Sequence, residues 1–148
     1  MPERRIVVAV GLPGAGKSTY FARRGIRPVS SDSLRAVLLG DETDQRFPDY
    51  IFSALRTLLR LRLLTGQPLS YLDATHLRRR ERAGYFVLAR RFGCGVDALY
   101  FDVPLEVCLE RNRQRPRHVS EAKLREMAAR LEPPTLAEGF RHIEVVRE

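Results

Sequence analysis

The sequence has no apolar run long enough to cross a membrane, and it contains very little cysteine. None of its apolar segments approaches the roughly 18 residues that a transmembrane helix requires. Residues 1–5 lead into a short apolar run that ends in glycines, without the longer apolar segment and small-residue cleavage site of a signal peptide. Cys94 and Cys108 lack metal-site spacing, so we expect two buried, reduced thiols. These features predict a cytoplasmic protein with no membrane contact.

Lysine is also scarce, although the chain is strongly basic. Of the 26 basic residues only Lys17 and Lys123 are lysines, and the formal net charge is +8. A basic domain is attracted to anionic partners such as nucleic acid. The arginine excess could equally reflect the composition of the genome, so the total charge is weak support for such a partner.

Short apolar runs alternate with helical patterns along the chain. The length of 148 residues, 44% of them apolar, indicates a single domain, residues 1–148. Strands are predicted at 6–10, 27–30, 68–73, 96–101 and 143–146. Helices are predicted at 16–24, 31–40, 50–65 and 77–92, with two more that begin at Pro104 and after Ser120. This alternation predicts an α/β fold whose parallel sheet is covered on both faces.

The most specific motif is a phosphate-binding loop at residues 11–18. Its sequence, GLPGAGKS, fits G-x-x-x-x-G-K-[ST] at every fixed position. Such glycines allow a tight turn whose backbone N–H groups point at phosphate oxygens, and the following helix adds its positive N-terminal end. Lys17 is expected to reach the outer phosphates, and the Ser18 hydroxyl to bind Mg²⁺. An apolar strand precedes the motif and a helix follows it, so we interpret the segment as a binding loop for ATP or another NTP.

Asp32 and Arg35 follow the second predicted strand, at the sheet edge where open α/β folds bind ligands. A small kinase needs a base for the acceptor hydroxyl, and Asp32 is the candidate. Arg35 lies three residues later, on the same helical face. The alternative is a helix capped by Ser31 or Asp32, with a purely local Asp–Arg pair.

Asp73 ends the third predicted strand, in the segment 69-LSYLDAT-75. An aspartate at the end of an apolar strand beside a phosphate loop would face the metal, directly or through water. A cap for the following helix is the alternative, and the two interpretations are compatible.

A run of arginines, 111-RNRQRPR-117, contains no acid. On a helix, Arg111 and Arg115 share one face and Arg113 takes the opposite one, while Pro116 should end the helix. This segment, about residues 111–119, is predicted to be a lid that closes over the triphosphate. A solvated charged turn is the alternative.

Together these segments resemble the P-loop 5′-hydroxyl polynucleotide kinases. They are most similar to the kinase domain of bacterial RNA-repair enzymes that carry kinase, phosphatase and ligase in one chain. The matching segments are, in order, GLPGAGKST, SSDSLR, DETDQ, LDAT, FDVPLEVCLERNRQRPR and EGFRHIEVV. The resemblance implies an adenylate-kinase-like three-layer sandwich, with a parallel sheet of about five strands in the order 2-3-1-4-5 and a short helical lid.

The resemblance also implies roles for single residues. Asp32 matches the general base that takes the proton of the 5′-hydroxyl, and Arg35 matches the arginine that binds the phosphate of the acceptor's first nucleotide. The nucleotide-binding set is Gly11, Pro13, Gly14, Ala15, Gly16, Lys17, Ser18, Thr19 and the lid arginines Arg111, Arg115 and Arg117. The catalytic set is Lys17, Asp32, Arg35, Arg111 and Arg115, and the metal set is Ser18 and Asp73.

The predicted function is transfer of the γ-phosphate of ATP or another NTP to the 5′-OH end of RNA or DNA. Arg35 favours this acceptor, because a kinase for sugars or small alcohols has no need to hold a phosphodiester beside the reacting hydroxyl. The alternatives are a small-molecule kinase of the same fold and a nucleotide-binding regulatory module without catalysis.

Two departures from the resemblance affect the prediction. No phosphatase or ligase segment is present, so separate phosphatase and ligase proteins would have to supply those steps. His76 stands where the family more often has Asn, and we expect a helix-capping or surface residue without chemistry. The loop at residues 41–45, DETDQ, resembles the family, but its sequence assigns it no role.

Overall fold

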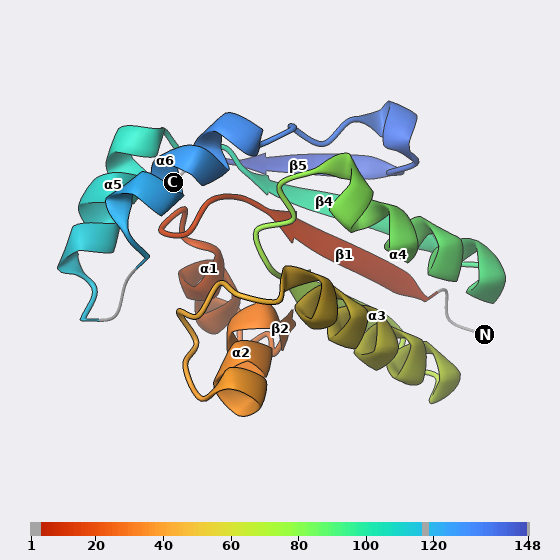
Figure 1. Cartoon of the computed structure of the whole chain (residues 1–148). Helices are drawn as coiled ribbons and strands as arrows, with labels where there is room; N and C mark the ends of the chain where they lie inside the picture. Colours follow the sequence, from red (N-terminus) through yellow and green to blue (C-terminus); the bar gives the residue numbers. More distant parts are fainter. Residues whose placement is uncertain (1–3, 117–118, 148) are drawn as a thin grey trace.

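One parallel sheet organises the structure, a computed structural model that describes residues 4–116 and 119–147 (Figure 1). The strands are β1 (Arg5–Val10), β2 (Val29–Ser30), β3 (Leu69–Asp73), β4 (Gly95–Phe101) and β5 (His142–Val146). Their spatial order is β2-β3-β1-β4-β5, and each neighbouring pair is parallel. The predicted strand order is therefore confirmed.

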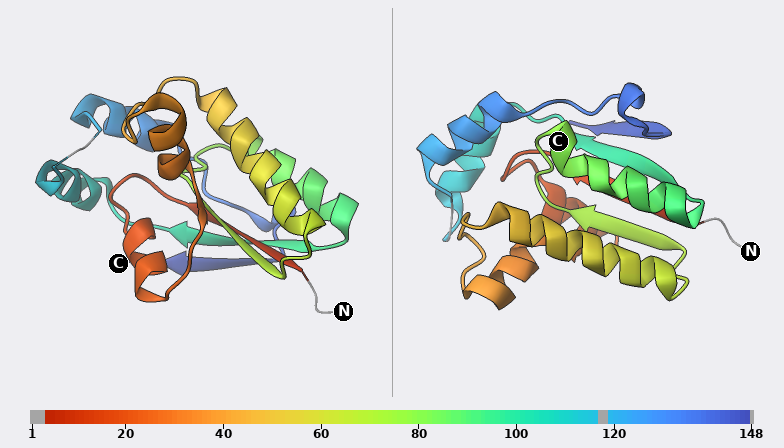
Figure 2. Two further views of the ribbon diagram at one scale, coloured as in Figure 1. Left: turned by 90° about the horizontal axis from the view of Figure 1, so that it is seen from below. Right: turned by 45° about the vertical axis from the view of Figure 1, so that its right-hand side comes forward.

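Helices cover both faces of this sheet. They are α1 (Lys17–Arg23), α2 (Ser31–Leu39), α3 (Pro48–Leu64), α4 (Arg79–Phe92), α5 (Leu105–Gln114) and α6 (Glu121–Arg130), with a short 3-10 helix, η1 (Leu136–Glu138). Alternate residues of β1 point to opposite faces. Ile6 and Val8 pack with α3 and α4, whereas Val7 and Ala9 pack with α1, α5 and α6. The three predicted layers are visible in Figure 2.

The carboxyl ends of the parallel strands lie at one edge of the sheet. There β1 leads through the phosphate loop into α1, and α2 begins directly after β2. β3 ends at Asp73, and β4 leads into the turn before α5. Ligands of open α/β folds bind at this edge. The sequence segments that carry the predicted site residues therefore meet there, although they are far apart in the chain.

Helix boundaries differ from the predicted ones for local reasons. α3 begins at Pro48 rather than at residue 50, because proline suits a first helical position whose N–H has no helical partner. α4 begins at Arg79 rather than at residue 77, because the backbone of Arg78 is still extended. Ser120 caps α6 as predicted, and its Oγ accepts a hydrogen bond from the N–H of Lys123. The sequence pattern does not indicate η1.

The two cysteines differ in burial, so the expectation of two buried thiols is confirmed for only one of them. Cys108 is a buried free thiol as predicted, whereas Cys94 is only partly buried, because it lies in the turn between α4 and β4. Burial raises the pKa of both thiols. Across the two described segments, no helix combines the length and the apolar character that a membrane span needs.

Candidate active site

The loop between β1 and α1 has the backbone that its glycines predict. Gly14 and Gly16 have φ values of 84° and 96°, in the left-handed region that side chains disfavour. A Cβ atom on Gly14 would also lie 2.9 Å from the carbonyl oxygen of Cys108 on α5. Only glycine satisfies both the conformation and the space at this position.

A cleft of about 1050 Å³ opens beside this loop at the carboxyl edge of the sheet. The predicted site residues that line it are Pro13, Gly14, Gly16, Lys17, Ser18, Thr19, Asp32, Arg35, Asp73, Arg111 and Arg115. Gly11 and Ala15 are instead buried, and their amides donate to the carbonyl oxygens of Thr75 and Leu12 at 3.0 and 3.1 Å. These two residues shape the loop from behind.

Lys17, the first residue of α1, folds back over the loop. Its Nζ donates to the carbonyl oxygens of Gly11 and Leu12, both at 2.9 Å. Burial lowers the pKa of Lys17, and the negative charges of Asp73 and Asp32 oppose that shift. The ammonium group therefore lies between the loop and two carboxylates, a position that suits contact with phosphate oxygens.

Asp32 lies in the first turn of α2 and faces the cleft. Ser30 caps this helix, because its Oγ accepts a hydrogen bond from the N–H of Ser33 at 3.3 Å. The alternative of a cap at Ser31 or Asp32 is therefore wrong. With the cap supplied elsewhere, the carboxylate of Asp32 is available to the cleft, and its side chain is 53% exposed.

Arg35 is buried although it borders the same cleft. It is only 8% exposed, and this burial lowers its pKa, while the charge of Asp32 opposes the shift. Its Nη1 donates to Oδ1 of Asp32 at 3.3 Å. Its Nε has no hydrogen-bond partner among the residues that the structure describes. A buried guanidinium with a spare donor is suited to bind an anion.

Asp73 and Ser18 supply oxygen atoms on the phosphate-loop side of the cleft. Asp73 is buried, and burial raises its pKa, whereas the charge of Lys17 lowers it. One carboxylate and one hydroxyl fit Mg²⁺, which commonly binds one or two protein oxygens together with waters and substrate phosphates. Within the described segments, no group of three or more His, Cys, Asp or Glu could hold a metal by itself. A cation here would thus depend on phosphate oxygens.

The arginines of the predicted lid segment, residues 111–119, differ in their surroundings. The Nη1 of Arg111 donates to the carbonyl oxygen of Gly14 at 3.1 Å, which ties α5 to the phosphate loop. Arg115 also lines the cleft, but α5 ends before it and its backbone is extended, so the two do not share a helical face. Arg113 pairs instead with Glu110 and Glu121. Arg117 lies outside the described residues.

The loop at residues 41–45, which had no predicted role, forms another wall of the cleft. Glu42, Thr43 and Gln45 line it. Oδ1 of Asp41 accepts hydrogen bonds from the N–H of Thr43 at 2.9 Å and from its hydroxyl at 2.7 Å, which fixes the turn. Asp44 contributes negative charge near Arg35, and hydrogen bonds from Arg46 lower its pKa to about 2. The loop therefore borders the part of the cleft that contains Arg35.

His76 is a core residue, so the expectation of a capping or surface histidine is wrong. It has no exposed surface, and its φ is positive, at 47°. Its Nδ1 lies 2.6 Å from the carbonyl oxygen of Ala9, and its Nε2 lies 2.8 Å from the hydroxyl of Tyr85. Because a carbonyl can only accept, Nδ1 carries the proton and Nε2 accepts from Tyr85. Burial lowers the pKa of His76 to about 3, which keeps the ring neutral.

Comparison with known protein families identifies the family of the chain. The model of the AAA_33 family, described as an AAA domain, matches residues 6–134. The chain belongs to the AAA_33 family. The matched range extends from β1 to the end of α6 and beyond, and it includes the phosphate loop, Asp32, Arg35 and α5.

The AAA_33 chain also has a curated relative, human L-seryl-tRNA(Sec) kinase. The two are 35% identical over 91 residues, which is 58% of this chain and 26% of the relative. The AAA_33 chain therefore matches about a quarter of the length of that protein.

Solved structures share the fold of the AAA_33 chain. Kti12 from Chaetomium thermophilum, in complex with ADP-AlF3, has a TM-score of 0.71 at 17% identity, with 96% of this chain and 88% of that one covered. A sugar kinase from Janibacter sp. HTCC2649 has a TM-score of 0.66 at 24% identity, with 99% and 86% covered. The Pnkp1/Rnl/Hen1 complex has a TM-score of 0.61 at 24% identity, with 83% and 43% covered. The chain therefore combines membership of the AAA_33 family with the three-layer α/β fold of these structures.

Proposed function

We propose that the chain is a polynucleotide 5′-hydroxyl kinase. It would transfer the γ-phosphoryl group of ATP or another NTP to the 5′-OH end of RNA or DNA. Its product, a 5′-phosphate end, is what a ligase consumes, so phosphatase and ligase proteins are the expected partners of a repair reaction in the cytoplasm. The observation that carries the proposal is the pair of Asp32 and Arg35, which border the same cleft as the phosphate loop.

Arg35 determines the choice of acceptor. Its guanidinium is buried, and its Nε has no hydrogen-bond partner among the described residues. A phosphodiester next to the reacting hydroxyl would supply both the missing acceptor and a negative charge, in a two-pronged contact. A free sugar or small alcohol has no such phosphate. We therefore place the 5′-terminal sugar beside Asp32 and the adjacent phosphate against Arg35.

Asp32 acts as the general base in this proposal. Its exposed carboxylate takes the proton of the 5′-hydroxyl as that oxygen attacks the γ-phosphorus in line. The new bond joins the 5′-oxygen to phosphorus, and the bond from phosphorus to the bridging oxygen breaks to release the nucleoside diphosphate. Lys17, Arg111 and Arg115 stabilise the negative charge that spreads over the transferred oxygens.

The metal set has a supporting role. Ser18 and Asp73 would hold Mg²⁺, directly or through water, and the cation would neutralise charge on the β- and γ-phosphates. The raised pKa of Asp73 shows that burial disfavours its charged form, so a neighbouring cation would stabilise the carboxylate.

A labelling experiment with matched acceptors tests the proposal. ATP labelled in the γ-phosphate is offered with a 5′-OH oligonucleotide, with the same oligonucleotide carrying a 5′-phosphate, and with a panel of sugars and small alcohols. We expect label only on the 5′-OH strand. Label on a small alcohol alone would contradict the polynucleotide acceptor, and nucleotide binding without any transfer would favour the regulatory module.

A second candidate acceptor is a small hydroxyl group, free or carried on an RNA. The similarity to human L-seryl-tRNA(Sec) kinase favours it. Because the phosphate loop, base and lid would be common to both reactions, only the acceptor distinguishes them. Seryl-tRNA is therefore a further acceptor in the labelling experiment, and label on the aminoacyl group rather than on a 5′ end would support this candidate.

A further inference from the structure

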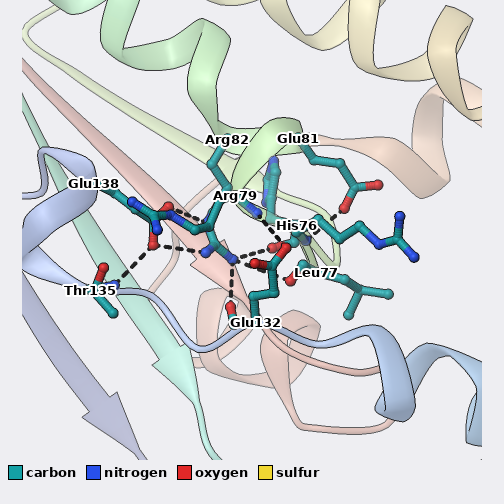
Figure 3. A network of polar contacts seen from close by, with 9 residues as sticks. His76, Leu77, Arg79, Glu81, Arg82, Glu132, Thr135 and Glu138 are labelled. Carbon is teal, nitrogen blue, oxygen red and sulfur yellow. Dashed lines mark hydrogen bonds and ion pairs between the residues drawn. The ribbon is translucent and has the colours of Figure 1, made fainter.

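A buried polar network surrounds Arg82 of α4 (Figure 3). The Nε and Nη2 of Arg82 donate to the two carboxylate oxygens of Glu138 at 2.9 and 2.8 Å. The side chains of both residues are almost completely buried, at 0% and 4% exposed. Removing two charges from water is unfavourable, and a buried ion pair is by itself weak support for stability. The surroundings of the pair indicate what else it does.

The remaining nitrogen of Arg82 binds two separate stretches of backbone. Its Nη1 donates to the carbonyl oxygens of His76 at 2.8 Å and Glu132 at 2.9 Å. The first carbonyl belongs to the turn between β3 and α4, and the second to the segment between α6 and η1. Glu138 also accepts a hydrogen bond from the N–H of Thr135 at 2.9 Å. The ion pair therefore joins the C-terminal segment to the turn that follows Asp73.

The same turn is held from its other side by the strand that leads into the phosphate loop. The ring of His76 donates to the carbonyl oxygen of Ala9, and the carbonyl oxygen of Thr75 accepts from the N–H of Gly11. Residues 74–77 are thus fixed between the phosphate loop and Arg82. This turn begins directly after Asp73, the last residue of β3, which lines the cleft together with Lys17 and Ser18.

We propose that Arg82, Glu138 and His76 are positioning residues of the nucleotide site, which fix the turn that holds Asp73 beside the phosphate loop. The inference rests on the proposed function in so far as Asp73 serves a metal–nucleotide complex. It does not depend on which acceptor is phosphorylated. Loss of the Glu138 charge is expected to loosen the turn, and thus to weaken binding of the nucleotide with Mg²⁺ more than binding of the nucleotide alone.

The test compares Glu138→Gln with wild type. Binding of a non-hydrolysable ATP analogue is titrated with and without Mg²⁺, in the absence of any acceptor. We expect the Mg²⁺ concentration at half-saturation to rise about tenfold, the lower end of what loss of a residue that orients a metal ligand causes, while Mg²⁺-free binding changes less than about twofold. Hydrogen exchange of the Gly11 amide should also become faster.

Asp97→Asn is the matched control. Asp97 is buried and accepts a hydrogen bond from Nε of Arg5 at 2.7 Å, at the opposite edge of the sheet. This variant should lose stability without a change in the Mg²⁺ dependence of binding. If Glu138→Gln does not fold, His76→Asn serves in its place, with the same expected rise. An unchanged Mg²⁺ dependence in the folded variant, or an equal change in Asp97→Asn, would overturn the proposal.

The failure of this inference differs from the failure of the proposed function. If wild type labels no 5′-OH strand and Glu138→Gln binds nucleotide with unaltered Mg²⁺ dependence, both proposals are refuted. Transfer to a 5′-OH strand with unaltered Mg²⁺ dependence in Glu138→Gln would refute only the positioning role.

Discussion

The surroundings of two buried arginines, Arg35 and Arg82, differ in how completely the guanidinium groups are hydrogen-bonded. On α4, each guanidinium nitrogen of Arg82 has an acceptor on Glu138 or on a backbone carbonyl. On α2, the Nη1 of Arg35 donates to Asp32, while its Nε has no partner in the described part of the chain. Arg35 lines the cleft, whereas Arg82 is not among its lining residues.

This difference distinguishes scaffold from binding site. A guanidinium whose donors are all satisfied within the protein has no capacity left for a ligand. A buried donor without an acceptor costs about 1–3 kcal/mol of desolvation, which a bound anion can offset. Burial and charge are similar for the two residues, so the completeness of hydrogen bonding is the more informative property.

The largest effect is expected at the carboxylate beside Arg35. Asp32→Ala should lower turnover by about 10²–10⁴-fold, because it removes the general base, while nucleotide binding stays unchanged. Asp49→Ala is a matched control, because both aspartates are the second residue of their helices and Asp49 is exposed. Rates of label transfer and binding of an ATP analogue are the measurements. Wild-type turnover in Asp32→Ala would show that the base has been assigned wrongly.

The comparison of the two arginines predicts effects on stability of different size. Arg82→Met should lower the free energy of unfolding by about 3–5 kcal/mol, because it leaves the Glu138 carboxylate buried and unpaired. Arg35→Met should change it by less than about 1 kcal/mol, because it also removes an unsatisfied donor. Urea unfolding of both variants measures the difference. Equal destabilisation would mean that Arg35 is part of the scaffold as well.

The KM for the acceptor is a second property that tests whether Arg35 belongs to the binding site. Arg35→Ala should raise the KM for a 5′-OH oligonucleotide about 10–100-fold, because a charge-assisted contact with its phosphate is lost, and should leave the KM for ATP unchanged. Arg46→Ala, at an exposed arginine in the neighbouring loop, is the control and should leave both constants unchanged. An unaltered acceptor KM in Arg35→Ala would remove the argument for a polynucleotide acceptor.

The smallest effect concerns the pH dependence of stability. The pKa of His76 is about 3 in the folded chain and about 6.5 in an unfolded one, so the unfolded state takes up the proton first as the pH falls. Wild type should therefore lose about 1 kcal/mol of stability per pH unit below about pH 6.5 and above about pH 3. His76→Asn should lack this slope, whereas His142→Asn, at an exposed histidine, should keep it. Urea unfolding at pH 7, 6 and 5 measures the free energy of unfolding of each variant. An equal pH dependence in wild type and His76→Asn would contradict the lowered pKa of His76.

Local patterns predicted the parts of the molecule that depend on neighbours in sequence. The phosphate loop, the strand at Arg5–Val10 and the cap at Ser120 were found because turn, strand and cap preferences act over a few residues. Arg82 was missed because it is one of several arginines in 78-RRRER-82, and its partner Glu138 lies 56 residues away. His76 was misjudged for the same reason, since its contacts with Ala9 and Tyr85 exist only in the folded chain.

The lysine of the phosphate loop has a thermodynamic consequence. Nζ of Lys17 already donates to two carbonyl oxygens of its own loop, which keeps the loop in shape. A triphosphate must therefore compete for an ammonium group that is already solvated by protein, and the lysine contributes only the difference between ionic and neutral acceptors. Calorimetric titration should then show only a modest enthalpy from this residue.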